Sequence, residues 1–218
     1  MTFVLNFFRD GGPFMYIILV VSVIAMATVI ERGYMILFRY NLNGAAFMAQ
    51  VQKLIMANNI DRAIKLCNAE SNAALTKVLK AGLTRANRRT EDITTAVEEA
   101  TLEVVPMLQK RTSYLGMWAN VATLLGLLGT ISGLVQAFKA VAAASPETKQ
   151  TMLAAGISVA MYTTAFGLVV AIPIMIAHSI IENRTKKLVD EIDQYSVKLI
   201  NLLAARNRGA LKEDGAAS

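Results

Sequence analysis

The feature that most constrains this chain is the run of residues 112–138, in which no side chain carries a charge. The run exceeds the roughly 20 apolar residues that a helix needs to cross a bilayer. Thr123 and Thr130 add hydroxyl groups, which hydrocarbon penalises unless protein or water meets them. The run also has the small-residue spacing that lets helix backbones approach closely inside a membrane, and we predict helix packing through Ala122, Gly126, Gly129 and Gly133.

Two further uncharged runs cover residues 11–30 and 150–181. Only 17% of the chain is charged, which is low beside the roughly 25% of a soluble domain. We therefore predict an all-α integral membrane protein with three transmembrane helices, at 13–38, 112–139 and 151–181. The third span again carries small and polar side chains, among them Ser158, Tyr162, Thr164 and Gly167.

Residues 39–111 are different in composition, with apolar side chains at helical spacing and many charges. We expect a helical region with a stop at Asn58 and Asn59, an N-cap at Thr90, and a bend near Pro106 where proline forfeits a hydrogen bond. A solvated helical face explains the basic residues of this region better than nucleic-acid binding does. A short loop over 140–150 turns at Ser145 and Pro146.

The two ends of the chain carry weaker signals. Residues 1–12 are predicted to form an interfacial segment, and a signal peptide is the less favoured alternative because the apolar run continues past Ala27. An amphipathic helix is expected over 182–207, followed by a disordered tail over 208–218.

Basic residues gather at one end of each predicted span. The positive-inside rule then places the N-terminus on the outer side of the membrane, and residues 39–111 and the C-terminus in the cytoplasm. The residues that carry this assignment are Arg32, Arg39, Lys110, Arg111, Arg184, Lys186 and Lys187, against Arg9, Lys139 and Lys149 on the other side.

No motif for nucleotide binding, metal binding or hydrolysis occurs, so we predict neither an enzyme nor a cofactor or metal site. Residues 112–138 and 150–181 contain no Asp, Glu, Lys or Arg. A proton path along these spans would need an acidic residue from a partner. The sole histidine, His178, is either a neutral interfacial residue or a proton relay, and the single cysteine, Cys67, excludes an intrachain disulfide.

The second span, NVATLLGLLGTISGLVQAF preceded by VEEATLEVVPMLQKR, resembles that of the MotA/TolQ/ExbB proton-channel family. GISVAMYTTAFGLVVAIPIMIAH resembles the family's third span, and the three-span layout is similar to the ExbB/TolQ branch. The resemblance implies a homopentamer around a dimer of an ExbD/TolR-like single-span partner, whose membrane Asp carries the proton. Thr130 and Thr164 match the family's pore threonines, whereas Val159 stands where many relatives have glutamate.

We therefore expect a stator or motor subunit that moves H⁺ and drives mechanical work, with an envelope-spanning effector as a further partner. Besides the two matched threonines, the predicted proton pathway includes Thr123, Ser158 and Tyr162, whose hydroxyls face an otherwise apolar environment. A non-conducting membrane scaffold is the alternative, and a secondary transporter would require inverted repeats or broken helices that three unequal spans do not offer. Import, envelope maintenance, gliding and secretion all stay open as the powered process, as does Na⁺ in place of H⁺.

Overall fold

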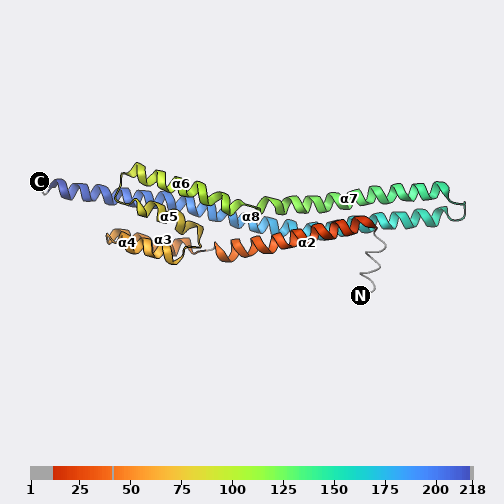
Figure 1. Ribbon diagram of the computed structural model, residues 1–218, viewed down its shortest axis with the longest axis horizontal. Helices are drawn as coiled ribbons and strands as arrows, with labels where there is room; N and C mark the ends of the chain where they lie inside the picture. The colour runs from red at the N-terminus through yellow and green to blue at the C-terminus, as the bar shows by residue number, and fades with distance from the viewer. Residues whose placement is uncertain (1–11, 41, 217–218) are drawn as a thin grey trace. The chain divides into compact units, whose positions relative to one another are not determined.

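The computed structural model of the protein describes residues 12–40 and 42–216, without the side chains of Phe38, Arg39 and 209–216. The predicted interfacial segment lies outside these residues except for Gly12. All regular secondary structure in the described part is helical (Figure 1). The elements are α2 (Pro13–Tyr34), the π-helical turn η1 (Met35–Arg39), α3 (Gly44–Met56), α4 (Ile60–Ala69), α5 (Ala74–Thr84), α6 (Thr90–Gln109), α7 (Thr112–Ala143) and α8 (Lys149–Ala216).

Three helical stretches are long and apolar enough to cross a membrane, which confirms the predicted class. They are Pro13–Leu37, Thr90–Ala143 and Lys149–Arg208. The chain divides into two compact units. The first, here the span unit, comprises Met1–Arg32 and Arg111–Ile180, and the second, the helical unit, comprises Gly33–Lys110 and Ile181–Ser218.

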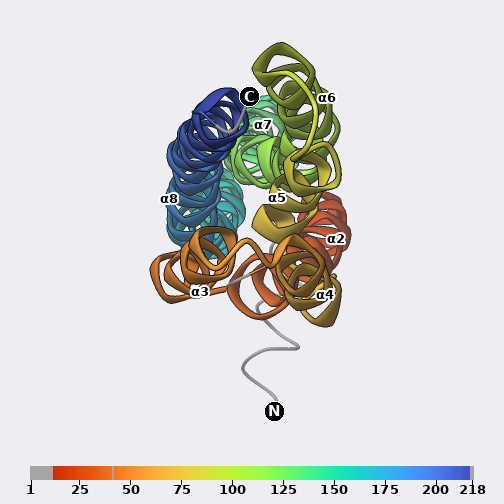
Figure 2. The ribbon, with the colours of Figure 1, turned by 90° about the vertical axis from the view of Figure 1, so that its left-hand side faces the viewer.

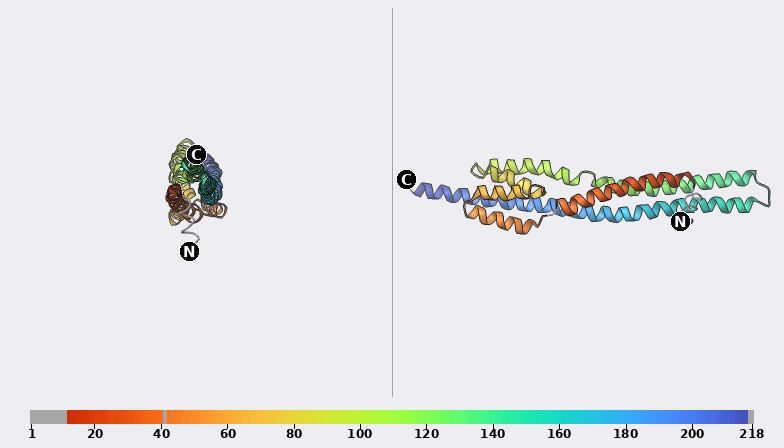
Figure 3. Two further views of the ribbon diagram at one scale, coloured as in Figure 1. Left: turned by 90° about the vertical axis from the view of Figure 1, so that its right-hand side faces the viewer. Right: turned by 60° about the horizontal axis from the view of Figure 1, so that its bottom comes forward.

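In the span unit, α2 packs alongside α7 and the first half of α8 (Figure 3). Apolar side chains form this contact, and most of those from α7 and α8 are small. The buried cluster consists of Ile18, Val21, Ala25, Ala119, Ala122, Val170, Ala171 and Ile174.

In the helical unit, α3 to α6 pack with the second half of α8 (Figure 2). Large aliphatic side chains fill its core, and the C-terminal part of α8 contributes Ile192 and Leu199 to it. Gly82 on α5 admits both α6 and α8 closely, since a Cβ added there would lie 2.7 Å from Val97 and 2.9 Å from Leu199.

Several local predictions need correction. Thr90 is the first residue of α6 rather than its N-cap; Arg89 takes that position, without a side-chain cap. Helix α6 continues past Pro106, where a bend is predicted, to Gln109. The helical conformation is interrupted at Lys110 and Arg111 instead, and Arg111 adopts a left-handed φ of 63°. The backbone is helical through Ala216, where a disordered tail was expected.

Two predicted turns do occur. Asn58 has a φ of 55° between α3 and α4, a conformation that asparagine tolerates better than most residues. Between α7 and α8, the amides of Thr148 and Lys149 donate to the Ser145 carbonyl at 3.0 and 3.2 Å. The second connection makes α7 and α8 antiparallel neighbours, which sets the geometry of the candidate site.

Candidate functional site

The contact between α7 and α8, here called the seam, consists of small residues on both helices. Gly126 faces Thr163, Thr164 and Gly167, with 3.2 Å from a Cβ at Gly126 to the Thr163 carbonyl oxygen. A Cβ at Gly167 would lie 2.8 Å from the Ala122 carbonyl oxygen. Backbone therefore meets backbone, which explains why the small residues recur at helical spacing.

The seam extends in both directions from Gly126. Further along α7, Gly129 faces Thr163, and Gly133 faces Ala160. A Cβ built at Gly133 would lie 3.1 Å from the Cβ of Ala160. The order of these contacts shows that the two helices run antiparallel. The predicted packing residues Ala122, Gly126, Gly129, Gly133 and Gly167 thus all lie in a contact within one chain.

Threonine hydroxyls beside the seam bond to backbone carbonyls. The Thr164 Oγ1 crosses the seam and donates to the Gly126 carbonyl at 3.1 Å. Thr130 and Thr123 bond within α7, to the carbonyls of Leu127 at 2.5 Å and Ala119 at 3.1 Å. A hydroxyl that donates once still has lone pairs with which to accept. Each of these threonines can therefore receive a further hydrogen bond.

The threonines share one side of the hairpin. At 100° per residue, Thr130 on α7 and Thr164 on α8 each lie roughly 70° from the centre of the seam, in the same rotational sense. Because the helices are antiparallel, both offsets turn toward the same side. Thr123 follows the same stripe as Thr130, seven residues earlier. Thr123 is exposed within the chain, and the other two are half-buried.

Helix α2 covers the opposite side of this hairpin. The half-buried side chains that pack against its cluster are offset from the seam in the other sense, as Trp118 and Leu125 on α7 and Phe166 on α8 show. The threonine side therefore has no covering helix from the span unit among the described residues. We call it the threonine face, defined by Thr123, Thr130 and Thr164.

Ser158 and Tyr162 do not join the threonine face. They lie six and two residues before Thr164, which places them roughly 120° and 160° around α8 from it. Their neighbour Val159 contacts the α2 side, with its Cγ1 3.7 Å from a Cβ built at Gly12. The structure thus separates the five predicted pathway residues into two groups, and Val159 lies apart from the threonine face.

At the charged end of the spans, the sequence identifies Arg32 and Arg111 as flanking charges but does not indicate their surroundings or the role of Glu31. Glu31 on α2 forms an ion pair with Arg111, the residue that precedes α7, and accepts a 2.6 Å hydrogen bond from its guanidinium. Arg32 is 3% exposed. Both Glu31 and Arg32 fall within the predicted span 13–38, so a search for ionisable residues inside that span would have found them.

His178 packs against α7, where its Cε1 would lie 3.2 Å from a Cβ at Gly116. This places the histidine on the seam, several turns from Thr164. Among the described residues, no group of three or more His, Cys, Asp or Glu side chains is arranged to hold a metal ion.

Several known proteins are similar to this chain. "Biopolymer transport protein exbB1" of Vibrio cholerae is 53% identical over 53 residues, which are 24% of this chain and 23% of that protein. A putative ExbB homolog of Methanothermobacter thermautotrophicus is 26% identical over 190 residues, 87% of this chain and 67% of the relative. The Tol-Pal system protein TolQ of Haemophilus influenzae is 38% identical over 90 residues, 41% of this chain and 37% of TolQ.

The matched segments thus span from about a quarter to two thirds of these relatives' lengths. The solved structure of C. jejuni MotAB shares the fold, with a TM-score of 0.65 at 19% identity over 88% of this chain and 78% of that one. Residues 70–194, more than half of the sequence, match the model of the MotA/TolQ/ExbB proton channel family. The chain belongs to the MotA/TolQ/ExbB proton channel family.

Proposed function

We propose that this protein is the channel subunit of an ExbB/TolQ-like inner-membrane complex that converts the proton motive force into mechanical work. The observation that carries the proposal is the threonine face, which presents three hydroxyls on one side of a hairpin otherwise lined by apolar side chains. Family membership supports the same reading. The proposed assembly is a homopentamer around a dimer of an ExbD/TolR-like single-span partner.

The chemistry of the proposal follows from what the threonine face lacks. No Asp, Glu, Lys or Arg occurs over 112–138 or 150–181, so the proton carrier must come from the partner, as a membrane Asp. A protonated carboxyl can donate to a threonine oxygen that already gives its own hydrogen to a carbonyl. An ionised carboxylate is costly in such surroundings unless a hydroxyl rotates to donate to it. The threonines would therefore support both states of the carrier.

The proposed orientation has the N-terminus in the periplasm and the C-terminus in the cytoplasm, because basic residues gather at one end of the spans. Each elementary charge that crosses 100 mV releases roughly 2.3 kcal/mol, so several protons must pass for a mechanical step of useful size. The effector that receives this work, and the transported ion as H⁺, belong to the same proposal.

The test is proton flux into vesicles that contain the full chain and an ExbD/TolR-like partner, with assembly checked in parallel. Thr164→Val keeps the side-chain shape but removes the hydroxyl, and Thr130→Val does the same on α7. We expect both variants to assemble and to lose partner-dependent flux. Because Thr164 also bonds to Gly126 across the seam, Thr164→Ser should restore flux by restoring the hydroxyl.

Two controls separate the threonine face from general damage to the helices. Thr163→Val removes a buried hydroxyl that donates to carbonyls of its own helix, those of Val159 and Ala160, and should retain flux. Tyr162→Phe removes a hydroxyl that lies roughly 160° around α8 from Thr164, and it should also retain flux. If both face variants conduct like wild type, the threonines are ordinary helix residues and the non-conducting scaffold is the better description.

A further inference from the structure

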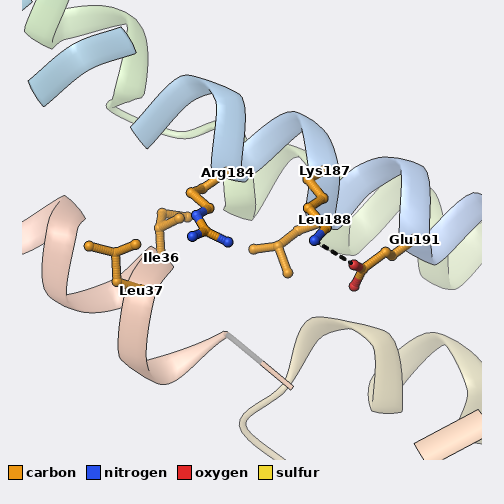
Figure 4. A pocket seen from close by; sticks show the side chains of 6 residues that line it. All are labelled: Ile36, Leu37, Arg184, Lys187, Leu188 and Glu191. Carbon is orange, nitrogen blue, oxygen red and sulfur yellow. Dashed lines mark ion pairs between the residues drawn. The ribbon is translucent and has the colours of Figure 1, made fainter. Parts of the chain in front are cut away.

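A small basic hollow lies in the helical unit, where the apolar runs of two spans end (Figure 4). Its volume of about 80 Å³ is well below the roughly 300 Å³ at which small-molecule pockets begin. It suits a compact group instead. The turn η1 and helix α8 line it, with Ile36, Leu37, Arg184, Lys187, Leu188 and Glu191.

The π-helical turn η1 supplies the apolar wall. Its geometry is set by the amide of Tyr40, which donates to the Met35 carbonyl five residues earlier at 3.0 Å. Ile36 is buried and Leu37 is 37% exposed, so the turn anchors one side chain and presents the next. Such turns are rare and often accompany functional sites.

Helix α8 supplies the charge. Figure 4 shows the Arg184 guanidinium extending from α8 toward Ile36, with Leu188 beside it. Lys187 forms a long ion pair with Glu191, at 3.8 Å. The preceding residue, Lys186, forms a shorter ion pair, at 2.9 Å from Glu182, and does not line the hollow.

We propose that this hollow binds the phosphate of an anionic phospholipid. Arg184 and Lys187 would donate to the phosphate oxygens, for which the planar guanidinium is well suited. Leu37 and Leu188 would contact the start of the lipid's apolar part. A lipid, rather than free phosphate, fits the position, because Leu37 is the last residue of a candidate span and Glu182 follows the uncharged run of α8.

The experiment uses the full chain in detergent, titrated with phosphatidylglycerol or phosphatidylcholine, with bound lipid counted by native mass spectrometry. Wild type should bind phosphatidylglycerol more tightly than phosphatidylcholine. Arg184→Gln and Lys187→Gln should each lower the affinity for phosphatidylglycerol by about fivefold. Lys186→Gln makes the same charge change outside the hollow and should leave binding unchanged. Excess inorganic phosphate should not displace the lipid.

A variant with the opposite expected sign guards against loss of fold as the cause. Glu191→Gln removes the carboxylate that competes for Lys187, so phosphatidylglycerol should bind more tightly than in wild type. The proposal is overturned if phosphatidylcholine binds equally well, if Lys186→Gln weakens binding as much as Arg184→Gln, if Glu191→Gln weakens it, or if phosphate displaces the lipid. None of these results depends on proton flux, so the proposed function is tested separately.

Discussion

The two units of this chain bury their helices in different ways. In the span unit, α7 meets α8 through glycine, alanine and threonine, and the large apolar side chains point away from the contact, as Leu124 and Val169 do. In the helical unit, the large side chains point inward, and Leu79, Ile93 and Leu199 are fully buried. The same sequence therefore uses two packing schemes.

The difference follows from the surroundings that each unit is built for. Burying aliphatic side chains is favourable when the alternative is water, and this drives the packing of the helical unit. Lipid tails are as apolar as leucine, so helices in a membrane gain little from burying large side chains and associate through close backbone contact. Truncating a large side chain should accordingly damage the helical unit most, and adding a methyl group should damage the span unit.

The largest expected effect is that of Leu199→Ala in the helical unit. Removing this fully buried side chain should lower the local free energy of opening by about 3 kcal/mol, because the surrounding helices cannot close the cavity. Hydrogen exchange of the α5 and α6 amides measures that loss. The matched control Val197→Ala, at a side chain 59% exposed, should change little. Equal effects of the two substitutions would contradict an aliphatic core.

In the span unit, Gly167→Ala tests the backbone contact. Its new Cβ would lie 2.8 Å from the Ala122 carbonyl oxygen and 3.0 Å from the Gly126 Cα, so α7 and α8 must separate. The overpacking cost exceeds what alanine gains in helix propensity, and we expect a net loss of about 1–2 kcal/mol in thermal unfolding in detergent.

Two other glycines grade this effect. The Cβ of Gly129→Ala would lie 2.7 Å from the Cβ and 2.8 Å from the Cγ2 of Thr163, a buried and β-branched side chain that cannot move aside, so this variant should cost about as much as Gly167→Ala. Gly33→Ala finds nothing within 4 Å and should be neutral or slightly stabilising. If Gly33→Ala and Gly167→Ala behave alike, the seam is not the close contact described here.

The sequence predicted this contrast only in part. Glycine spacing identified the face of α7 that packs closely, because only that spacing keeps small residues on one side of a helix. It could not identify the partner helix as α8 of the same chain. Ser158 and Tyr162 were grouped with Thr164 by residue type, although helical phase alone separates them. The break at Arg111 rather than Pro106 depends on a left-handed residue that no local pattern announces.

A third, smaller effect concerns the polar contacts that close the helical unit. Arg206 on α8 donates to the Oδ1 atoms of Asn58 at 2.9 Å and Asn87 at 3.0 Å, which belong to the turns after α3 and α5. Arg206→Ala should cost about 1 kcal/mol, because both bonds are partly exposed to solvent. Amide exchange should rise in both turns and stay unchanged in α7.

The control for the Arg206 contacts is Arg208→Ala, since Arg208 donates to the Ala204 carbonyl of its own helix at 3.3 Å. Arg206→Lys should resemble the alanine variant, because an ammonium lacks the planar fork that reaches two acceptors. Faster exchange in both turns with Arg208→Ala would refute the role of Arg206.

The smallest expected effect is a pH dependence confined to the helical unit. Burial raises the pKa of the Cys67 thiol from 9.0 to about 11, partly opposed by the charge of Lys80. The folded unit therefore keeps this proton at a pH where the unfolded chain has lost it. The corresponding stability is fully present below pH 9.0 and is lost as the pH rises toward about 11.

Comparison with Cys67→Ala isolates this contribution, because the other groups titrate equally in both proteins. The stability against thermal unfolding should fall more steeply with pH for wild type than for Cys67→Ala between pH 9.0 and about 11. Below that range, the stabilities of the two proteins should change in parallel. The native thiol, 1% exposed and protonated, should also resist maleimide until the helical unit opens. Leu199→Ala should then speed labelling of Cys67 whereas Gly167→Ala should not, because the second substitution loosens the seam and leaves the aliphatic core around Cys67 intact. Fast labelling in both variants would show that the two packing schemes fail together.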